Sequence, residues 1–85
     1  MNVETIKTPS LLLDLDRVRA NAALIGEVAS RNGARLRPHI KTHKCIEVAK
    51  IQTAGHNGAI TVSNLANARD FAANGFTDIT YAVPI

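Results

Sequence analysis

Basic and apolar side chains alternate in the segment Leu36–Cys45, whose sequence is LRPHIKTHKC. On a β-strand alternate residues share a face, so Arg37, His39 and Lys41 would point to one side and the apolar residues between them to the other. Lys41 would end this strand, and parallel α/β folds place their chemistry at the carboxyl ends of strands. A lysine amine is a nucleophile suited to Schiff-base formation. The spacing therefore makes Lys41 a candidate catalytic nucleophile. The alternative is that it is a solvated loop residue.

The same part of the chain is strongly basic. Residues 31–50 carry six lysine and arginine side chains against one acidic side chain, a local net charge of +5 in a chain whose overall charge is +3. Such a cluster suits an anion, either a phosphate group or a nucleic-acid backbone. The aromatic residues Phe71, Phe76 and Tyr81 lie outside it, whereas a single-strand binder interleaves stacking rings with its basic residues. The charge pattern favours a small anionic ligand over nucleic acid.

The composition is that of a globular protein. Of the 85 residues, 46% are hydrophobic and 20% are charged, which excludes collagen-like and disordered classes. Cys45 is the single cysteine, so a disulfide framework and a multi-cysteine metal site are excluded. The apolar run Leu11–Leu15 is too short for a membrane span. We therefore expect no membrane association and a reducing, cytoplasmic setting.

Four segments have the composition of β-strands. In chain order the expected strands are Ser10–Leu15, Arg35–Lys41, Gly58–Ser63 and Asp78–Val83. The third is uncharged and rich in β-branched residues, as in a strand that is buried on both faces. Pro38 counts against a central position for the second strand, because proline has no N–H to donate to a ladder.

Helical patterns fill the intervals between these strands, and each of them ends at a glycine. The expected helices are one capped by Asp14 or Asp16 and ended by Gly33, one over 43–54 capped by Thr42 and ended by Gly55, and one through Leu65–Ala72 ended by Gly75. The alternation of strands and helices predicts parallel strands joined by crossover helices. The expected fold class is α/β.

Four strands and three helices do not complete such a fold, because a parallel sheet needs helices on both faces or closure into a barrel. A complete (β/α)8 barrel takes about 250 residues. We therefore expect residues 1–85 to be the N-terminal part of a TIM-type barrel. On this interpretation the 85 residues alone would neither fold stably nor be active.

Three stretches of the chain resemble one enzyme family. They are Thr8-Pro9-Ser10-Leu-Leu-Leu-Asp14-Leu-Asp16, Leu36-Arg-Pro-His-Ile-Lys41-Thr-His-Lys-Cys45, and Ile60-Thr-Val-Ser-Asn-Leu65 through Phe71-Ala-Ala-Asn-Gly75 to Asp78-Ile-Thr-Tyr-Ala-Val83. They resemble the D-threonine aldolase and D-serine dehydratase group of fold-type III pyridoxal-phosphate enzymes, whose barrel is shared with alanine racemase. The resemblance covers nearly the whole chain from Thr8 onward, and its specific part is His39-x-Lys41-x-His43-Lys44.

The resemblance implies a lyase that acts on β-hydroxy D-amino acids with pyridoxal 5'-phosphate as cofactor. Lys41 matches the lysine that forms the Schiff base, and His39 would lie beside the cofactor, brace the lysine, or be satisfied within the barrel floor. The cofactor is an electron sink, for cleavage of the Cα–Cβ bond as in an aldolase or for loss of the β-hydroxyl as in a dehydratase. These two outcomes stay open.

The resemblance also implies a divalent metal (Mn, Mg or Zn) and a C-terminal β-domain, both outside this segment. It implies a homodimer as well. The family tends to give its first strand, here Ser10–Leu15, to the β-domain, so the first barrel strand would then be Arg35–Lys41.

Residues around the motif are expected to have structural roles. Arg37 should pair with a barrel carboxylate rather than touch substrate. His43 and Lys44 should lie at a helix start or on the rim, and Cys45 should be an inert helix residue.

Tyr81 and Asn67 lie in the later part of the chain, outside the basic motif. Tyr81 is expected to be a core tyrosine with a bonded hydroxyl, and the alternative is that it reaches the site. Asn67 stands where related sequences usually carry a glutamate, which puts in doubt any role there that needs a charge.

Two further functions stay open beside the lyase. One is an amino-acid racemase on the same barrel, which would need a second acid or base on the opposite face of the substrate. The other is a non-catalytic module that uses the basic stretch to bind pyridoxal phosphate or nucleic acid.

Overall fold

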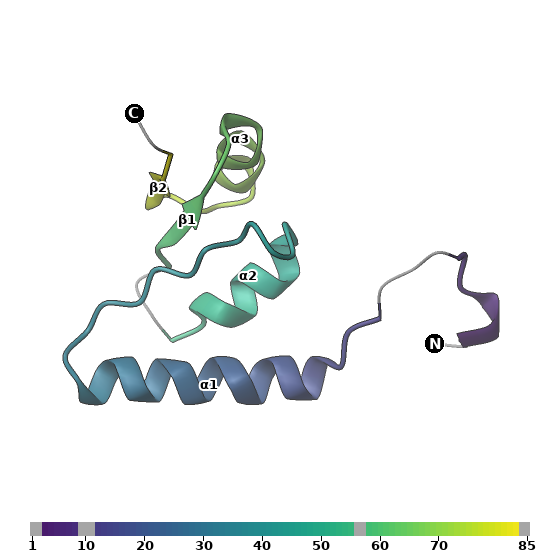
Figure 1. The fold of residues 1–85 in the computed structure, drawn as a ribbon, viewed down its shortest axis with the longest axis horizontal. Helices are drawn as coiled ribbons and strands as arrows, with labels where there is room; N and C mark the ends of the chain where they lie inside the picture. The colour runs from purple at the N-terminus through teal and green to yellow at the C-terminus, as the bar shows by residue number, and fades with distance from the viewer. Residues whose placement is uncertain (1–2, 9–11, 56–57, 84–85) are drawn as a thin grey trace.

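The structure is a computed structural model that describes residues 3–8, 12–55 and 58–83. Its elements are the 3-10 turn Val3–Thr5, α1 (Leu15–Arg31), α2 (Ile46–Thr53), β1 (Ile60–Val62), α3 (Leu65–Ala73) and β2 (Ile79–Tyr81). In Figure 1, α2 lies between the long helix α1 and the two strands, and α3 lies beside the strands. None of the helices in the described ranges is long and apolar enough to cross a membrane.

The sheet consists of successive chain segments that run in parallel. β1 and β2 pair with Ile60 opposite Ile79 and Val62 opposite Tyr81. On the other edge of β1, His39 forms a parallel bridge with Thr61. The fold class is therefore α/β, with helices that connect parallel segments, as the alternation of patterns predicted.

The expected strand Arg35–Lys41 is much shorter than predicted. Its pairing is confined to the bridge at His39, where the Thr61 N–H donates to the Pro38 carbonyl at 2.8 Å and the Ile40 N–H donates to the Thr61 carbonyl at 3.0 Å. Pro38 has no N–H of its own, so one position of the ladder is lost. The segment before it is extended without forming a regular strand.

The expected strand Ser10–Leu15 is wrong in the part that the structure describes. Residues 9–11 lie outside the described residues, 12–14 have no regular secondary structure, and Leu15 is the first residue of α1. The physical reason is the cap: the Asp14 side chain accepts a hydrogen bond from the Arg17 N–H at 3.3 Å, which satisfies a free donor at the helix start. At the other end α1 stops as predicted, with Gly33 in the left-handed region at φ +64°.

α2 begins later than predicted. Residues 41–43 form a turn, Cys45 is the N-cap, and Ile46 is the first helical residue, so the expected cap at Thr42 is wrong. Lys44 explains the delay, because its φ of +51° places it in the left-handed region and a right-handed helix cannot pass through it.

The helix through Leu65–Ala72 is confirmed as α3. It is capped by Asn64, whose side chain accepts from the Asn67 N–H at 2.7 Å. Gly75 follows the helix at φ +97°.

The core lies between the sheet and the helices α2 and α3. Its buried members are Ile40, Ala49, Ile60, Val62, Phe71 and Phe76. The rings of Phe71 and Phe76 pack at a centroid distance of 5.4 Å with a tilt of 58°. Burial of a large apolar side chain contributes about 1.5–3 kcal/mol, so this cluster anchors the end of the 35–41 segment that leads into the basic motif.

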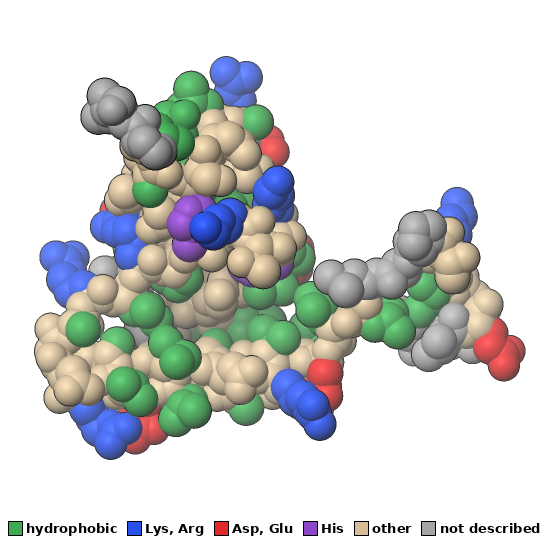
Figure 2. Space-filling model, in the orientation of Figure 1, with side chains coloured by type: hydrophobic (Ala, Val, Ile, Leu, Met, Phe, Trp, Pro, Cys, Tyr) green, Lys and Arg blue, Asp and Glu red, His purple; other side chains and the backbone are tan. Residues whose placement is uncertain are grey.

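α1 is different, because none of its residues is buried. Large apolar side chains on it face solvent, among them Leu24, Ile25 and Val28. Figure 2 shows green side chains spread along the exposed surface of this helix.

Candidate functional site

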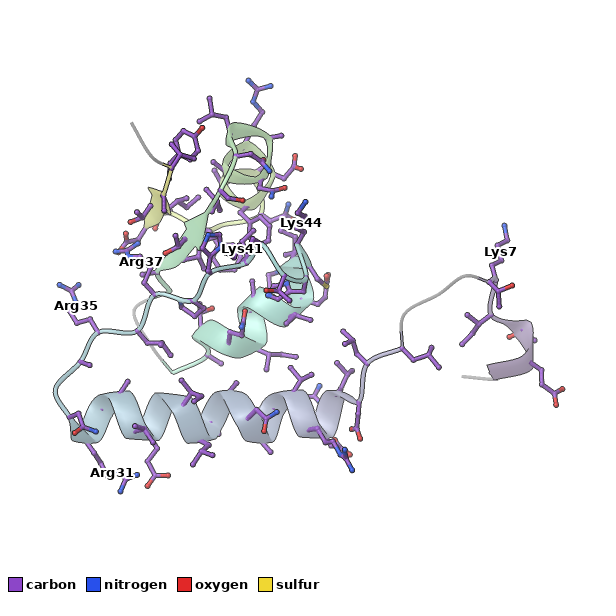
Figure 3. The ribbon with its side chains drawn as sticks, in the orientation of Figure 1. Lys7, Arg31, Arg35, Arg37, Lys41 and Lys44 are labelled. Carbon is purple, nitrogen blue, oxygen red and sulfur yellow. The ribbon has the colours of Figure 1, made fainter. Side chains whose placement is uncertain are left out.

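Lys41 lies where the extended segment leaves the sheet. The residue before it, Ile40, is fully buried and holds its place through the hydrogen bond from its N–H to the Thr61 carbonyl. Lys41 itself is exposed and opens the turn of residues 41–43 (Figure 3). The structure therefore places the predicted nucleophile at the carboxyl end of a parallel segment, the edge at which such folds hold their ligands.

The register defines an open face of the sheet beside Lys41. Residues paired across neighbouring strands share a face, so His39, Thr61 and Thr80 lie on one side. Ile60 and Val62, on the other side, are fully buried in the core. His39 and Thr61 are half-buried and Thr80 is exposed, so the face that carries His39 is the one that the described helices leave open.

His39 contacts the backbone of Lys41. Its Nδ1 accepts a hydrogen bond from the Lys41 N–H at 3.1 Å. Since Nδ1 is the acceptor, the proton of the neutral ring resides on Nε2. Within the described ranges this nitrogen makes no hydrogen bond, so it can donate to a ligand while Nδ1 braces the lysine backbone.

Arg37 lies at the other end of the same segment, away from Lys41. Its Nη1 is 2.7 Å from Asp78 Oδ1 and also donates to the carbonyl oxygens of Ile60 and Asp78, each at 3.2 Å. The predicted pairing of Arg37 with a barrel carboxylate is confirmed. Because Ile60 begins β1 and Asp78 precedes β2, this side chain ties together the amino ends of three chain segments.

The same contact perturbs Asp78. The hydrogen bond from Arg37 lowers the pKa of its carboxyl, with added attraction from the charges of Arg37 and Arg35, while desolvation opposes the shift. The two side chains are one-third and just under one-half exposed, so solvent screens the pair in part. The positive charge of Arg37 is thus engaged at the amino ends of the strands, not at the Lys41 edge.

His43 occupies the turn after Lys41. Its Nδ1 accepts from the Cys45 N–H at 2.9 Å, and its Nε2 lies 2.9 Å from Gln52 Oε1 in α2. Lys44 is exposed and leads into the helix. The prediction that His43 and Lys44 lie at a helix start is confirmed, and Cys45 is the half-buried N-cap rather than a residue within the helix.

Gln52 has a role that the sequence analysis did not assign. It is four residues after the buried Val48 on the same face of α2, since residues at this spacing lie above one another on a helix. A polar side chain on the buried face of a helix needs a hydrogen-bond partner, and this spacing is the sequence feature that could have identified Gln52.

Tyr81 is 47% exposed in the described part of the chain. Its register opposite Val62 places it on the face of the core cluster and not on the face of His39 and Thr61. The alternative that it reaches the site is therefore wrong, whereas the register agrees with the expected core position. A bonded hydroxyl stays a prediction.

Asn67 lies in the first turn of α3. Its side-chain nitrogen is buried and has no hydrogen-bond partner among the described residues.

The basic residues do not gather into one surface. Arg31 pairs with Glu27 at 3.8 Å and Arg37 with Asp78. In Figure 3, Arg31 and Arg35 lie near the end of α1, whereas Lys44 lies at the far side near the start of α2. A nucleic-acid backbone needs a continuous basic stripe, so the +5 stretch does not form such an interface in the described residues.

No three metal-ligating side chains come together within residues 3–8, 12–55 and 58–83. The divalent metal was expected outside this segment, and it stays a prediction.

Comparison with known proteins adds independent findings. A family model described as "Alanine racemase, N-terminal domain" matches residues 13–83. The chain is 47% identical over 79 residues to D-threo-3-hydroxyaspartate dehydratase from Delftia sp. (strain HT23), covering 93% of this chain and 21% of that protein. It is 36% identical over 89 residues to D-serine dehydratase from Dictyostelium discoideum, covering 99% and 22%. It is 40% identical over 74 residues to D-threonine aldolase from Arthrobacter sp, covering 87% and 20%.

The backbone shows the same similarity. The solved structure of D-threo-3-hydroxyaspartate dehydratase from Delftia sp. HT23 matches with a TM-score of 0.88 and 46% identity, over 95% of this chain and 21% of that one. Another structure of this dehydratase, a C353A mutant, is described as its metal-free form and matches with a TM-score of 0.87, 48% identity and the same coverage. The chain thus spans about a fifth of the length of these relatives.

Proposed function

Because the chain belongs to the alanine racemase N-terminal domain family, we propose that it forms part of a pyridoxal-phosphate-dependent lyase acting on β-hydroxy D-amino acids. Lys41 is the residue proposed to hold the cofactor covalently. The observation that carries the proposal is its position: an exposed lysine at the carboxyl end of a parallel segment, next to a buried residue and with its backbone N–H bound by His39.

The residues present fit an aldehyde cofactor. The Lys41 side chain makes no ion pair within the described ranges, so its amine is available to a carbonyl carbon. The ring proton of neutral His39 lies on Nε2, because Nδ1 accepts from the Lys41 N–H. When bound, pyridoxal phosphate supplies an electron sink for the bond that breaks. Lys41 binds and positions it, and His39 holds the lysine backbone and offers a hydrogen-bond donor.

The substrate class comes from the relatives. Their names are those of dehydratases and aldolases for D-threo-3-hydroxyaspartate, 3-hydroxy-D-aspartate, D-serine and D-threonine. All of these compounds are D-amino acids with a hydroxyl group on Cβ. These names support a lyase over a racemase, and the scattered basic residues argue against a nucleic-acid-binding module.

The remaining features are proposed for the whole protein. Residues 1–85 would form the N-terminal portion of the cofactor-binding barrel, the divalent metal and the C-terminal β-domain would lie in other parts, and the whole protein would be a homodimer. A relative whose structure was also determined in a metal-free form supports the metal. In the lyase, the metal would hold the β-hydroxyl of the substrate.

The test uses the whole protein with pyridoxal phosphate. Borohydride reduction followed by peptide mass spectrometry should find the cofactor attached to Lys41, and Lys41→Ala should lose both the adduct and its visible absorbance. Lys50→Ala is the matched control, since Lys50 is an exposed lysine on α2. An adduct that persists in Lys41→Ala would contradict the proposal.

Product analysis then identifies the reaction. With D-threonine an aldolase releases glycine and acetaldehyde, whereas with D-serine a dehydratase releases pyruvate and ammonia. Interconversion of D- and L-alanine without release of either set would instead support the racemase.

A further inference from the structure

We propose that His43 is a positioning residue that fixes the Lys41 turn between the sheet and α2, and this inference rests on the function proposed above for Lys41. The turn is short and its two ends are anchored differently. At its start, Ile40 is fully buried and bonded to β1 through the Thr61 carbonyl. At its end, the chain must reverse into α2 through a residue in an unfavourable conformation.

That residue is Lys44, whose φ of +51° is uncommon for any side chain other than glycine, asparagine or aspartate. Two hydrogen bonds hold the turn in this shape. The Lys44 N–H donates back to the Ile40 carbonyl at 2.8 Å, and the next N–H, that of Cys45, donates to His43 Nδ1 at 2.9 Å. Strained backbone persists only where its surroundings over-determine it, so the contact of His43 is part of what keeps the turn closed.

The imidazole also connects the turn to the helix. Because Nδ1 accepts from Cys45, the ring proton lies on Nε2, which donates to Gln52 Oε1 at 2.9 Å. Gln52 lies in the last turn of α2, the helix that the buried residues Val48 and Ala49 attach to the core. One rigid ring therefore spans from the exit of the turn to a packed helix.

No other side chain of the turn provides this connection. In the described part of the chain, the side-chain hydrogen bond between residues 41–44 and α2 is that of His43. On the sheet side, His39 binds the Lys41 N–H. Two histidines thus make the same local contact on either side of the turn, each accepting from the N–H two residues later: His39 from Lys41, and His43 from Cys45.

The conformation of the turn sets the backbone position of Lys41, and therefore where its side-chain amine can reach. If His43 is lost, the turn samples more conformations, and the fraction in which the amine reaches its target falls. A single hydrogen bond of this kind changes such a population by about three- to tenfold.

The test compares three variants of the whole protein. His43→Ala removes both contacts. His43→Asn keeps an acceptor for the N–H two residues later, because asparagine forms this turn bond with its own side chain, but it does not reach Gln52. Thr53→Ala is the matched control: it removes a 2.9 Å hydrogen bond from the Thr53 hydroxyl to the Ala49 carbonyl in the same helix without touching the turn.

Two measurements separate positioning from general stability. Amide hydrogen exchange of the 41–46 peptide reports the turn, and the fraction of Lys41 trapped by borohydride at limiting cofactor reports the lysine. For His43→Ala we expect faster exchange and a trapped fraction about three- to tenfold lower, at an unfolding midpoint close to that of Thr53→Ala. His43→Asn should restore the protection of the turn and recover part of the trapping, and Thr53→Ala should leave both unchanged.

Two outcomes would overturn the inference alone: normal trapping in both His43 variants, or equal loss in Thr53→Ala. If His43→Ala does not fold, His43→Asn decides, since unchanged trapping and unchanged kcat and KM in that variant show that the contact with Gln52 has no positioning role. Absence of a Lys41 adduct in the unchanged protein would instead overturn the proposed function itself, together with the catalytic part of this inference.

Discussion

α1 and the sheet-centred part of the chain are both built from amphipathic segments, yet only one of them has a core. β1, α2 and α3 bring Ile60, Ala49 and Phe71 into one buried cluster. α1 is the longest helix described, has a good cap, and buries no residue. α1 contacts α2, and hollows of about 650 Å³ and 440 Å³ lie between α1, α2 and residues 34–39. A helix can therefore be fully specified by local signals while none of its side chains is buried in the described part of the chain.

The largest contrast should appear when one large side chain is truncated in each region. Phe71→Ala leaves a cavity in the cluster and should cost about 3–5 kcal/mol of unfolding free energy in the whole protein. Leu24→Ala, at a position 56% exposed on α1 and outside the core cluster, should cost less than Phe71→Ala. Urea unfolding of both variants checks this, and equal losses would mean that α1 is packed as tightly as the core.

The helix caps sharpen the comparison with a smaller effect. Asn64→Ala removes a 2.7 Å, partly buried cap of α3, and should cost about 1–2 kcal/mol. Asp14→Ala removes a 3.3 Å, exposed cap of α1, and should cost about 0.5 kcal/mol. Unfolding by denaturant provides the measurement. Serine at either position, which also caps helices, should restore most of the loss.

A third effect depends on pH and belongs to the sheet region. The hydrogen bond from Arg37 lowers the pKa of Asp78, so the folded state binds a proton there less readily than the unfolded chain does. The stabilisation that ionised Asp78 provides is complete at pH values above the ordinary aspartate pKa. It is lost as the pH falls through the lowered pKa of the folded state. Asp78→Asn should therefore reduce the acid-induced drop in the thermal midpoint below about pH 4. Asp16→Asn on α1 is the control, and an identical profile in both variants would refute the role of the pair.

The smallest effect should come from the surface of α1. Glu27 and Arg31 lie 3.8 Å apart with both side chains about two-thirds exposed. Exposed pairs at this helical spacing contribute about 0.3–0.5 kcal/mol. Glu27→Gln should lower the free energy of unfolding by no more than this amount. The resulting shift of the thermal midpoint should vanish in high salt. A loss as large as that of a cap would show that α1 is more integrated than its exposure indicates.

The helices were largely predictable because their signals act over a few residues. Asp14 bonds an N–H three residues later, and Gly33 and Gly75 adopt the positive φ that the chain needs after a helix. α2 is the exception. Its start was predicted at 43 and lies at Ile46. Lys44 is left-handed and its N–H bonds the carbonyl of Ile40, whose own N–H is bonded to Thr61 in β1.

The strands were less predictable than the helices. The apolar run before α1 has the composition of a strand, but Asp14 caps the helix and Leu15 is its first residue. Tyr81 was expected in the core, and its register opposite Val62 places it on the core face, yet it is exposed in the described part of the chain. Burial depends on what lies opposite a side chain, and composition carries no such information.

The sequence by itself determined which residues are available for chemistry and on which side of their segment they lie. The two-residue period of an extended chain is enough to separate Arg37, His39 and Lys41 from Ile40. The tertiary structure decided their partners: Asp78 for Arg37, 41 residues along the chain, and Thr61 for the backbone on either side of His39. The physical reason is that side-chain alternation is a property of the local backbone, whereas the register between parallel segments is set by the burial of Ile40, Ile60 and Phe71 in one cluster.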